Sequence, residues 1–389
     1  MSDKADLPDL LYSDTEQALA DSISSLLADR GSVDTVLART ESIETYDEAL
    51  WQAVAGDLGC AGLLIPERAG GAGASYREAC SAAEALGAAV APVPFLGSSV
   101  VATAALLSAA SDWPDGTADG LLRRMADGGV TAALAVPFAT APGAAFPLPV
   151  RVTAPRPGDE RTGVARLRGM VSGAADALPA SVLLVPADGV PDGLYLVDMS
   201  AQGVAKAPVV SLDMTRQLCD LSFDDVPGTL IASGPAATRA YQAALTAGAG
   251  VLASELTGLA QRCLDMTVAY VKERRQFGRP VGSFQGVKHR LADVWVTVSQ
   301  ARAASRYAAA CLASGAPDTP IAVALAKAYC SDAAVQAAQE CVQLHGGIGF
   351  TWEHPAHLYL KRAKADSIAF GTAGAHRAAL AALVELPAS

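Results

Sequence analysis

Residues 274–285 read RRQFGRPVGSFQ, and they separate two long stretches of apolar helical periodicity. Before them, leucines recur at helical spacing from residue 252 to residue 264, and the FGRP tetrapeptide then ends the pattern because Gly and Pro do not continue a helix. Arg274 and Arg275 precede this break, where guanidinium groups complement the helix dipole and can donate two hydrogen bonds to a pyrophosphate. A plain C-terminal helix charge is the alternative for an isolated arginine. The stretch therefore predicts a helix end that can also bind phosphate.

The chain changes character twice along its length. Apolar residues follow helical spacing from about residue 14 to residue 111, and again from about residue 236 to the end. Between these parts, Pro and Gly separate short β-type runs such as SVLLVPA (181–187) and GLYLVDM (193–199). We therefore expect a mainly α protein with a small central β-domain. The expected boundaries are an N-terminal helical domain at residues 1–128, a central β-domain at 129–232 and a C-terminal helical bundle at 233–389.

Composition argues against several classes of function. With 389 residues, the chain is long enough for two or three packed units. Its net charge of −11 disfavours nonspecific binding to nucleic acid or to an anionic membrane, because both need a basic surface. The seven cysteines form no C-x-x-C pair, so we predict neither a disulfide framework nor a bound metal. The N-terminal run MSDKADLPDLLYSD lacks the basic flank and apolar core of a signal peptide, and we expect a cytoplasmic protein.

Two longer segments carry a family resemblance. YVKERRQFGRPVGSFQGVKHRLADV (270–294) and CVQLHGGIGFTWEHPAHLYLKRAKA (341–365) resemble the flavin-binding segment and the C-terminal signature of the acyl-CoA dehydrogenase family. Weaker similarity extends to GLLIPERAGGAGASYREA (62–79) and VVSLDMTRQLCDLSFDDVP (209–227). The resemblance implies dehydrogenation of an acyl-CoA thioester to a 2-enoyl-CoA, with FAD as cofactor and an electron-transfer flavoprotein as electron acceptor. The family also has the expected order of helices, β-domain and helical bundle.

The resemblance further implies which residues bind FAD. In the family, the arginine-containing segment and the Gln-x-x-Gly-Gly segment reach across a dimer interface to the FAD of the neighbouring subunit. Glycine suits such a contact because no Cβ keeps the backbone away from a ligand. Carried over position by position, the residues implied to bind FAD are Arg274, Gln276, Phe277, Phe284, Gln285, Gln343, His345, Gly346, Gly347 and Thr372.

The glutamate that acts as the family's catalytic base is missing from both of its known positions. Phe370 stands immediately before the Gly-Thr pair near the C-terminus, and Gly248 stands at the alternative position on the long helix. Glu255 follows Gly248 by two helical turns, about 10 Å along the axis, and is a weak candidate base. A salt-bridged helix glutamate is the favoured alternative for Glu255. The catalytic residue is therefore unknown from the sequence.

The β-domain also departs from the family pattern. Ala135 and Val136 stand where the family usually has polar residues beside the flavin, and Ser172 is the nearest hydroxyl to the usual Trp-Ile-Thr position. Residues that serve a chain's own flavin are lost, whereas those that reach a neighbour's FAD are retained. Two functions stay open: an acyl-CoA dehydrogenase with an unidentified base, or a catalytically silent subunit that completes the FAD site of an active paralogue. The first allows a homo-oligomer and the second requires a hetero-oligomer, and the acyl group, whether from a lipid or a steroid, is not specified.

Overall fold

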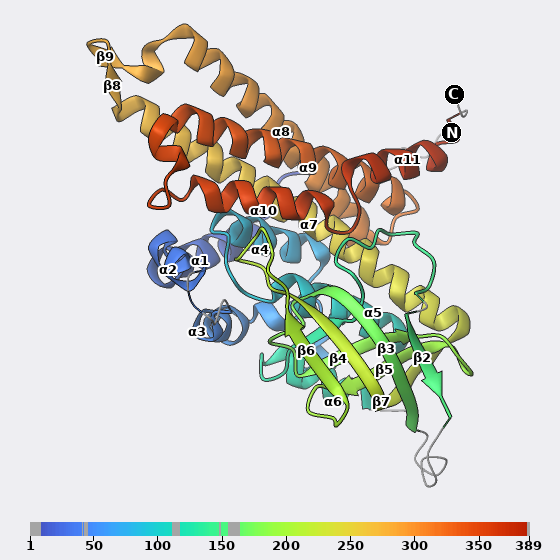
Figure 1. Ribbon diagram of the computed structural model, residues 1–389. Coiled ribbons are helices and arrows are strands. Elements are labelled where there is room, and N and C mark those ends of the chain that lie inside the picture. The colour runs from blue at the N-terminus through green and yellow to red at the C-terminus, as the bar shows by residue number, and fades with distance from the viewer. Residues whose placement is uncertain are drawn as a thin grey trace, which may run out of the picture.

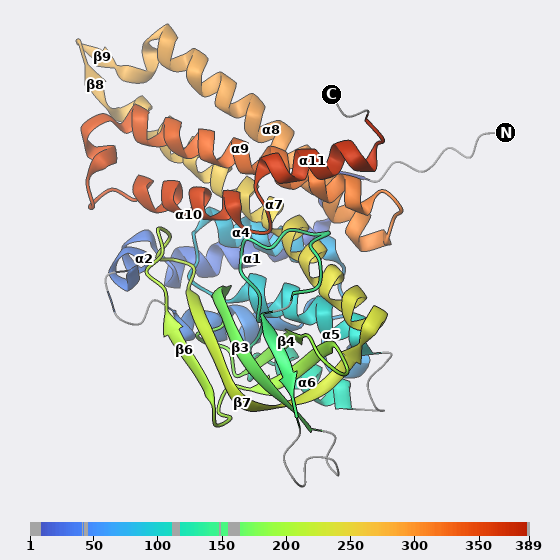
Figure 2. The ribbon, with the colours of Figure 1, turned by 45° about the vertical axis from the view of Figure 1, so that its right-hand side comes forward.

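The computed structural model describes residues 9–40, 42, 46–110, 117–147, 149–154 and 164–386. An N-terminal helical part, a central β-sheet and a C-terminal helical bundle follow one another along the chain (Figures 1 and 2). The predicted fold class, mainly α with a small central β-domain, is confirmed.

The N-terminal helices begin where the sequence offers side-chain caps. Ser13 and Glu16 form a capping box at the start of the first helix, and Ser75 and Glu78 form a second one. Each box satisfies backbone N–H groups that have no partner inside the helix. The helices are α1 (Asp14–Arg30), α2 (Val33–Thr40), α3 (Glu48–Gln52), α4 (Tyr76–Ala88), α5 (Thr103–Ala109) and α6 (Thr117–Ala126), with π-helical turns at Ala53–Asp57 and Phe95–Ala102.

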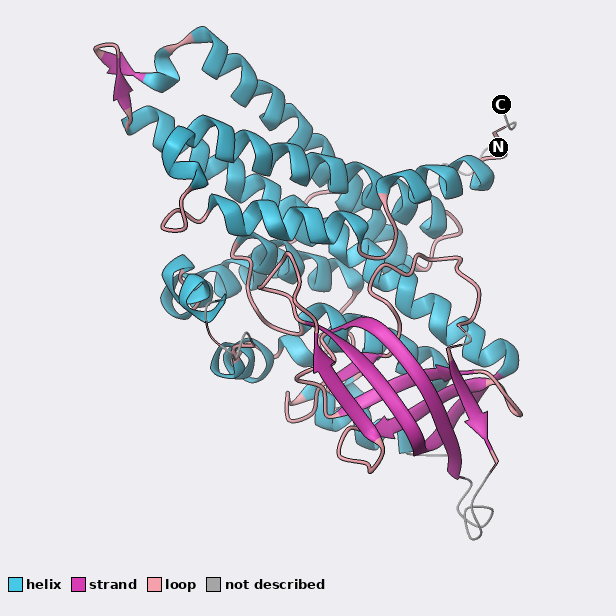
Figure 3. Ribbon diagram, viewed as in Figure 1, coloured by secondary structure: helices cyan, strands magenta, loops and turns pink. Residues whose placement is uncertain are grey.

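The central sheet has seven strands and curls against the helices (Figure 3). The strands pair in the order β1-β4-β5-β7-β3-β2, and β6 adds to β7. Leu184 and Leu194 join the main core shared with the helices, whereas Leu183 and Tyr195 belong to a second core within the sheet. The strands are β1 (Ala132–Leu134), β2 (Val150–Thr153), β3 (Val164–Ala175), β4 (Val182–Ala187), β5 (Gly193–Asp198), β6 (Val204–Pro208) and β7 (Leu218–Ser233).

A 40-residue helix, α7 (Gly234–Glu273), forms the centre of the molecule and packs against α4, α5, α8 and α9. By length and composition it could cross a membrane, but 89% of its apolar window is buried inside the protein, as expected of a core helix. A Cβ at Gly258 would clash with the carbonyl group of Glu84, so glycine is what lets α4 approach α7 closely. The other C-terminal helices are α8 (Gln285–Ser314), α9 (Thr319–His345), α10 (Ala356–Ile368) and α11 (Ala373–Leu383).

Beyond α7 the chain forms a two-stranded hairpin, β8 (Arg275–Gln276) and β9 (Arg279–Pro280). The hairpin projects from one end of the bundle, away from α11 and from the central sheet (Figure 1). Its two turn residues, Phe277 and Gly278, have φ values of 53° and 76°, the pair of positive angles typical of a type I′ turn. The predicted helix end before FGRP is confirmed, and the hairpin that follows it was not predicted.

Candidate functional site

The two positions at which the family carries its glutamate lie against each other in this chain. The Phe370 side chain is buried, with 4% of its residue surface exposed. Gly248 lies in the middle of α7, and a Cβ at this residue would come within 2.6 Å of the Phe370 ring. The ring therefore fills the space that a longer side chain at position 248 would occupy. Neither residue has a group that can accept a proton.

The space around the Phe370 ring is closed. Phe138 packs edge-on against it, with 5.2 Å between the ring centroids. Val136 and Asp176 line the same cavity, whose volume is about 20 Å³. Pockets that hold drug-sized ligands measure roughly 300–1,000 Å³. Val136, which replaces a polar family residue, thus helps to close the region where the family's base and flavin would meet.

A left-handed backbone conformation at Phe370, with φ of 51°, places its ring in this position. Bulky residues rarely adopt this conformation without support from their surroundings. Lys327 Nζ donates hydrogen bonds to the carbonyl oxygens of Asp366 (3.0 Å) and Gly371 (3.3 Å), and His376 Nε2 donates to that of Phe370 (2.8 Å). Burial lowers the pKa of Lys327 to about 8. The Phe370 turn is therefore held by two buried basic side chains.

Glu255 is held in ion pairs. Its two carboxylate oxygens accept hydrogen bonds from Arg216 at 2.7 and 2.8 Å, and Arg362 Nε donates to one of them at 2.9 Å. Burial alone would raise the pKa of Glu255, but the two guanidinium groups outweigh burial and lower it to about 2. A carboxylate with so low a pKa is a weak base for an α-proton. The geometry favours the salt-bridged alternative for Glu255 over the role of base.

Three further carboxylates surround this pair of arginines. Asp366 lies 2.9 Å from Arg362, Asp213 lies 3.5 Å from the same guanidinium, and Asp176 lies 3.7 Å from Arg216. Burial raises the pKa of Asp366 to about 7 although the two arginines oppose this effect. We refer to the six residues Glu255, Asp366, Asp213, Asp176, Arg216 and Arg362 as the charge network.

The charge network joins all three parts of the protein. Asp176 follows β3 and accepts a hydrogen bond from the backbone N–H of Gly97, near the N-terminal helices, at 2.9 Å. Asp213 and Arg216 lie between β6 and β7, and the remaining members lie on α7 and α10. Arg216 also lies over the Phe138 ring, 5.4 Å from its centroid. The network is therefore directly beside the closed cavity at Phe370.

The first group of predicted FAD residues lies on the exposed hairpin. Arg274 is the C-cap of α7, Gln276 lies in β8, and Phe277 in the turn is 91% exposed. The Phe277 ring contacts Phe284 edge-on, with 6.1 Å between centroids, and the Arg279 guanidinium lies 3.9 Å from the centroid of Phe284. Within the described part of the chain, the arginines of this segment form no ion pair. Gln285, the first residue of α8, is exposed beside them.

The second group lies where α9 ends. Gly346 is the C-cap, and its φ of 64° requires glycine. Gly347 does not have a positive φ, and a Cβ at this residue would meet nothing within 4 Å. Neither its backbone conformation nor packing inside this chain therefore requires glycine. An exposed backbone with open space in front of it suits close approach by a phosphate. Gln343 is exposed just before this turn, whereas His345 is buried.

The hairpin and the glycine turn lie close together. Tyr270, in the last turn of α7, stacks on His345 with 4.4 Å between centroids, and its carbonyl oxygen accepts a hydrogen bond from the Arg274 N–H at 2.9 Å. Guanidinium donors, an open backbone turn and free aromatic faces fit a ligand that combines phosphate with an aromatic heterocycle. Thr372 instead caps α11, where its hydroxyl accepts a hydrogen bond from Ala375 N at 3.2 Å, two residues after Phe370.

Large apolar side chains are exposed on the same segments. Phe350 and Trp352, which follow the glycine turn, are 76% and 63% exposed. Trp295 and Val296 on α8 are 61% and 46% exposed. Exposed apolar residues are ordinary when single, and two exposed aromatic residues follow the glycine turn directly.

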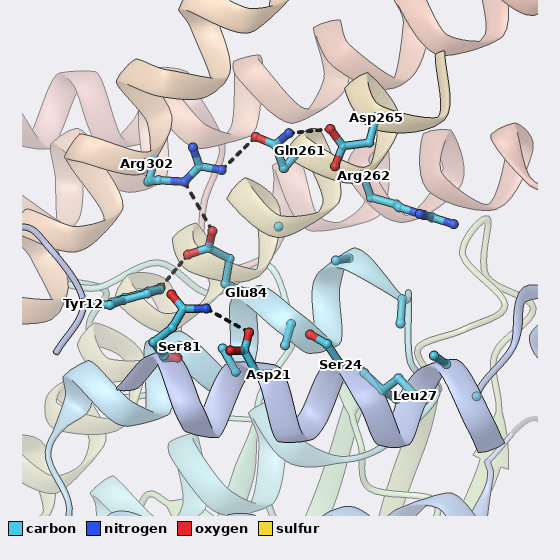
Figure 4. Close-up of a pocket in the computed structure, with 18 of the residues that line it drawn as sticks. Tyr12, Asp21, Ser24, Leu27, Ser81, Glu84, Gln261, Arg262, Asp265 and Arg302 are labelled. Carbon is cyan, nitrogen blue, oxygen red and sulfur yellow. Dashed lines mark hydrogen bonds and ion pairs between the residues drawn. The ribbon is translucent and has the colours of Figure 1, made fainter. Parts of the chain in front are cut away.

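A separate cavity of about 840 Å³ lies between α1, α4 and α7 (Figure 4). Its polar groups largely bond to one another: Tyr12 donates to Glu84 at 2.5 Å, and Gln261 bridges Arg302 and Asp265 at 2.8 and 2.7 Å. None of the predicted site residues lines this cavity. It therefore contributes nothing to the site described above.

Comparison with known proteins matches both helical parts of the chain to one family. The model described as "Acyl-CoA dehydrogenase, N-terminal domain" matches residues 13–116, and "Acyl-CoA dehydrogenase, C-terminal domain" matches residues 238–384. The chain is 36% identical over 347 residues to acyl-CoA dehydrogenase IpdE2 of Mycobacterium tuberculosis. The aligned region covers 89% of this chain and 90% of that protein. It is 35% identical over 308 residues to acyl-CoA dehydrogenase FadE34 of the same organism, covering 79% of this chain and 38% of FadE34.

Two similar solved structures carry names of paired components. One is the ChsE4-ChsE5 complex from Mycobacterium tuberculosis, with 25% identity, a TM-score of 0.84 and coverage of 98% of this chain and 100% of that chain. The other is a steroid acyl-CoA dehydrogenase described as Tcur3481-Tcur3483, with 28% identity, a TM-score of 0.81 and coverage of 96% and 98%.

Proposed function

The chain belongs to the acyl-CoA dehydrogenase family, and from that premise we propose that it is a catalytically silent subunit of a heteromeric acyl-CoA dehydrogenase. Its partner is a paralogue that retains the catalytic glutamate, and this chain completes the partner's FAD site. The observation that carries the proposal is the contact between Phe370 and Gly248. It fills the position of the base with a side chain that cannot accept a proton.

The surroundings of Phe370 support the same proposal. An acyl chain needs an apolar pocket, whereas this region holds a cavity of about 20 Å³ bordered by the charge network. Breaking a buried ion pair typically costs about 3–5 kcal/mol, which opposes its displacement by an acyl group. Glu255 belongs to that network and is therefore not free to act as the base.

Apart from Thr372, the residues proposed to hold FAD lie near the C-terminal end of α7. FAD, when bound, supplies a flavin ring that accepts a hydride. Arg274 would donate hydrogen bonds to the pyrophosphate, Gly346 and Gly347 would let the phosphates approach the backbone, and Phe277 would offer an aromatic face. The remaining members of the proposed set are Gln276, Phe284, Gln285, Gln343, His345 and Thr372.

The relatives support a two-component assembly and a substrate class. The ChsE4-ChsE5 structure is named as a complex, and the Tcur3481-Tcur3483 structure is named as a steroid acyl-CoA dehydrogenase. We propose accordingly that the assembled enzyme acts on a steroidal acyl-CoA. Electrons would pass to an electron-transfer flavoprotein, as the family resemblance implies.

Visible absorption spectra of the chain alone, and of the chain co-expressed with a glutamate-retaining paralogue, test this proposal. We expect a colourless chain, and a complex whose flavin band bleaches when a steroidal acyl-CoA is added. If the chain purified without a partner contains flavin, and its flavin band bleaches when an acyl-CoA is added, the silent-subunit proposal is wrong. That result would instead support the alternative, a dehydrogenase with an unidentified base.

Arg274→Ala tests whether Arg274 binds the FAD of the neighbouring subunit. A charged hydrogen-bond donor to phosphate contributes about 1.5–3 kcal/mol, so FAD affinity of the complex should fall roughly tenfold or more. Arg377→Ala is the matched control, because Arg377 is an exposed arginine on α11 that pairs with Asp332. Equal FAD retention by the two variants would contradict a role for Arg274.

A further inference from the structure

His345 ends α9 with an imidazole ring that is fixed by several contacts. The residue is 3% exposed. Its Nδ1 lies 2.6 Å from the carbonyl oxygen of Cys341 and 3.6 Å from Sγ of the same cysteine, one helical turn earlier. The ring centroid is 4.4 Å from that of Tyr270 and 4.3 Å from that of His354. These contacts determine both the position and the plane of the ring.

The contact at Nδ1 also determines where the ring carries a proton. A carbonyl oxygen can only accept, so Nδ1 of His345 must be the donor to the Cys341 carbonyl. The other nitrogen, Nε2, makes no hydrogen bond to another residue in the described ranges. A second proton at Nε2 would make the ring a cation.

The groups around the ring favour that cation. Burial alone would lower the pKa of His345, but the hydrogen bonds to the thiol and the carbonyl group of Cys341 outweigh burial and raise it. The Cys263 thiol lowers the pKa of Cys341 to about 5, against the effect of burial and with help from His345. The C-terminal end of a helix dipole also stabilises a cation in the last turn. Geometry and charge therefore favour a thiolate at Cys341 beside an imidazolium at His345.

We propose that Cys341 is a positioning residue for His345: it orients the imidazole, and its thiolate accepts a hydrogen bond from Nδ1 and so stabilises a second proton at Nε2, which makes the ring a cation beside the Gly346–Gly347 turn. Nδ1 keeps the proton that it shares with Cys341, Sγ releases its proton to solvent and Nε2 takes one from solvent, so the pair has no net charge. Positive charge is then next to the turn, and negative charge remains on the buried sulfur. This inference rests on the proposed function, because it concerns a turn proposed to bind the phosphates of FAD.

The proposal predicts a pH dependence of phosphate binding. A cation beside an open backbone turn strengthens the binding of an anion. Since its pKa is raised, His345 is charged below that pKa and loses its charge as the pH rises through it. The titratable or charged groups around this pair are Cys263, Tyr270 and Arg262 on α7, Cys341 on α9, His354 before α10, and Tyr359 on α10.

NMR titration of the His345 imidazole in the purified chain tests the proposal without FAD. We expect a pKa above the ordinary value of about 6.5 in the unaltered chain. In Cys341→Ala the pKa of His345 should fall, because the thiol no longer opposes the effect of burial. Cys341→Ser keeps the side-chain volume and should also lose the raised pKa, whereas Cys330→Ser, at another buried cysteine of α9, should not. An unchanged titration in both Cys341 variants would overturn the proposal.

FAD retention by the assembled complex separates this inference from the proposed function. Cys341→Ala should weaken FAD binding roughly two- to fivefold below the His345 titration, the size expected for one charge at a helix end, and should flatten the pH dependence. If Arg274→Ala releases FAD while Cys341→Ala changes neither affinity nor pH dependence, this inference fails and the proposed function stands. If neither variant affects FAD retention, the proposed function fails and the inference fails with it.

Discussion

Phe277 and Phe370 adopt nearly the same backbone conformation in opposite surroundings. Their φ values are 53° and 51°, in the left-handed region that bulky side chains avoid. Phe277 is 91% exposed on a projecting hairpin, whereas Phe370 is 4% exposed in the core. Each such residue costs about 1–3 kcal/mol, which its surroundings must offset.

The two surroundings offset that cost differently. Around Phe370, this chain supplies hydrogen bonds from Lys327 and His376 and the packing of Phe138. Around Phe277, the recorded ring contact is Phe284, and the ring otherwise faces outward. The hairpin's own type I′ turn accommodates the positive φ of Phe277, and under the proposed function a bound cofactor would cover its exposed ring. The middle of α7 thus serves this chain's own packing, whereas its C-terminal end carries residues proposed to serve an assembly.

The largest effect that would test this contrast is on folding stability. Phe370→Ala should lower the free energy of unfolding by about 3–5 kcal/mol, because it leaves a cavity against Gly248 and Phe138. Phe277→Ala should change it by less than about 0.5 kcal/mol, since the ring is exposed. Urea denaturation of the purified chain measures both values. Similar losses of unfolding free energy in the two variants would contradict the proposed difference between Phe277 and Phe370.

The charge network beside Phe370 should make this part of the protein sensitive to acid. The folded-state pKa of Glu255 is lowered to about 2 from its ordinary value of 4.5. Between these values the unfolded chain binds the proton and the folded chain does not, so the stabilisation is present above pH 4.5 and is lost as the pH falls toward 2. Its size is on the order of 3 kcal/mol.

Urea denaturation of the wild-type chain and of Glu255→Gln across this pH range measures the effect. The variant should lose the part of the acid dependence that belongs to Glu255. Asp366→Asn is an informative control, because the pKa of Asp366 is raised to about 7 and its ionisation destabilises the fold as the pH rises from 3.8. Identical acid dependence in Glu255→Gln and wild type would contradict the assigned role of the network.

The smallest expected effect is at the hairpin and appears only in the assembly. Phe277→Ala should weaken FAD retention by the complex roughly two- to tenfold, the range expected from losing one aromatic contact. The stability of the isolated chain should stay unchanged, and Phe277→Gly should raise it slightly because strain is relieved. Met170→Ala is the control, since Met170 is a 62% exposed apolar residue on β3. Unaltered FAD retention in both Phe277 variants would show that the ring is not a cofactor contact.

Hydrophobic periodicity was sufficient to predict the order of the fold. The β-type runs at 181–187 and 193–199 correspond to β4 and β5, and the leucines from residue 252 onward lie buried along α7. These patterns are local, because a strand or a helix repeats its buried face every two or every three to four residues. The hairpin after Arg274 was missed because Phe at its first turn position is not a usual signal for a type I′ turn.

The site was predictable as separate positions but not as contacts. The sequence identified Phe370 and Gly248 individually, yet it gave no sign that their atoms meet. Arg216 and Glu255 are 39 residues apart in the sequence, and Arg362 and Glu255 are 107 apart. A periodic sequence pattern does not predict contacts between residues so far apart. Arg362 and Asp366 are four residues apart on one helix, and this spacing was the one local signal for part of the network.

The contact between Gly248 and Phe370 also bears on how this chain can evolve. Gly248→Glu alone would drive a side chain into the Phe370 ring, and Phe370→Glu alone would leave a void and bury a carboxylate near Asp176. Either first step is disfavoured by folding stability before selection on activity can act. A glutamate at either position would therefore need a compensating change at the other. The packing of one aromatic ring thus limits which single substitutions can restore a carboxylate at either position.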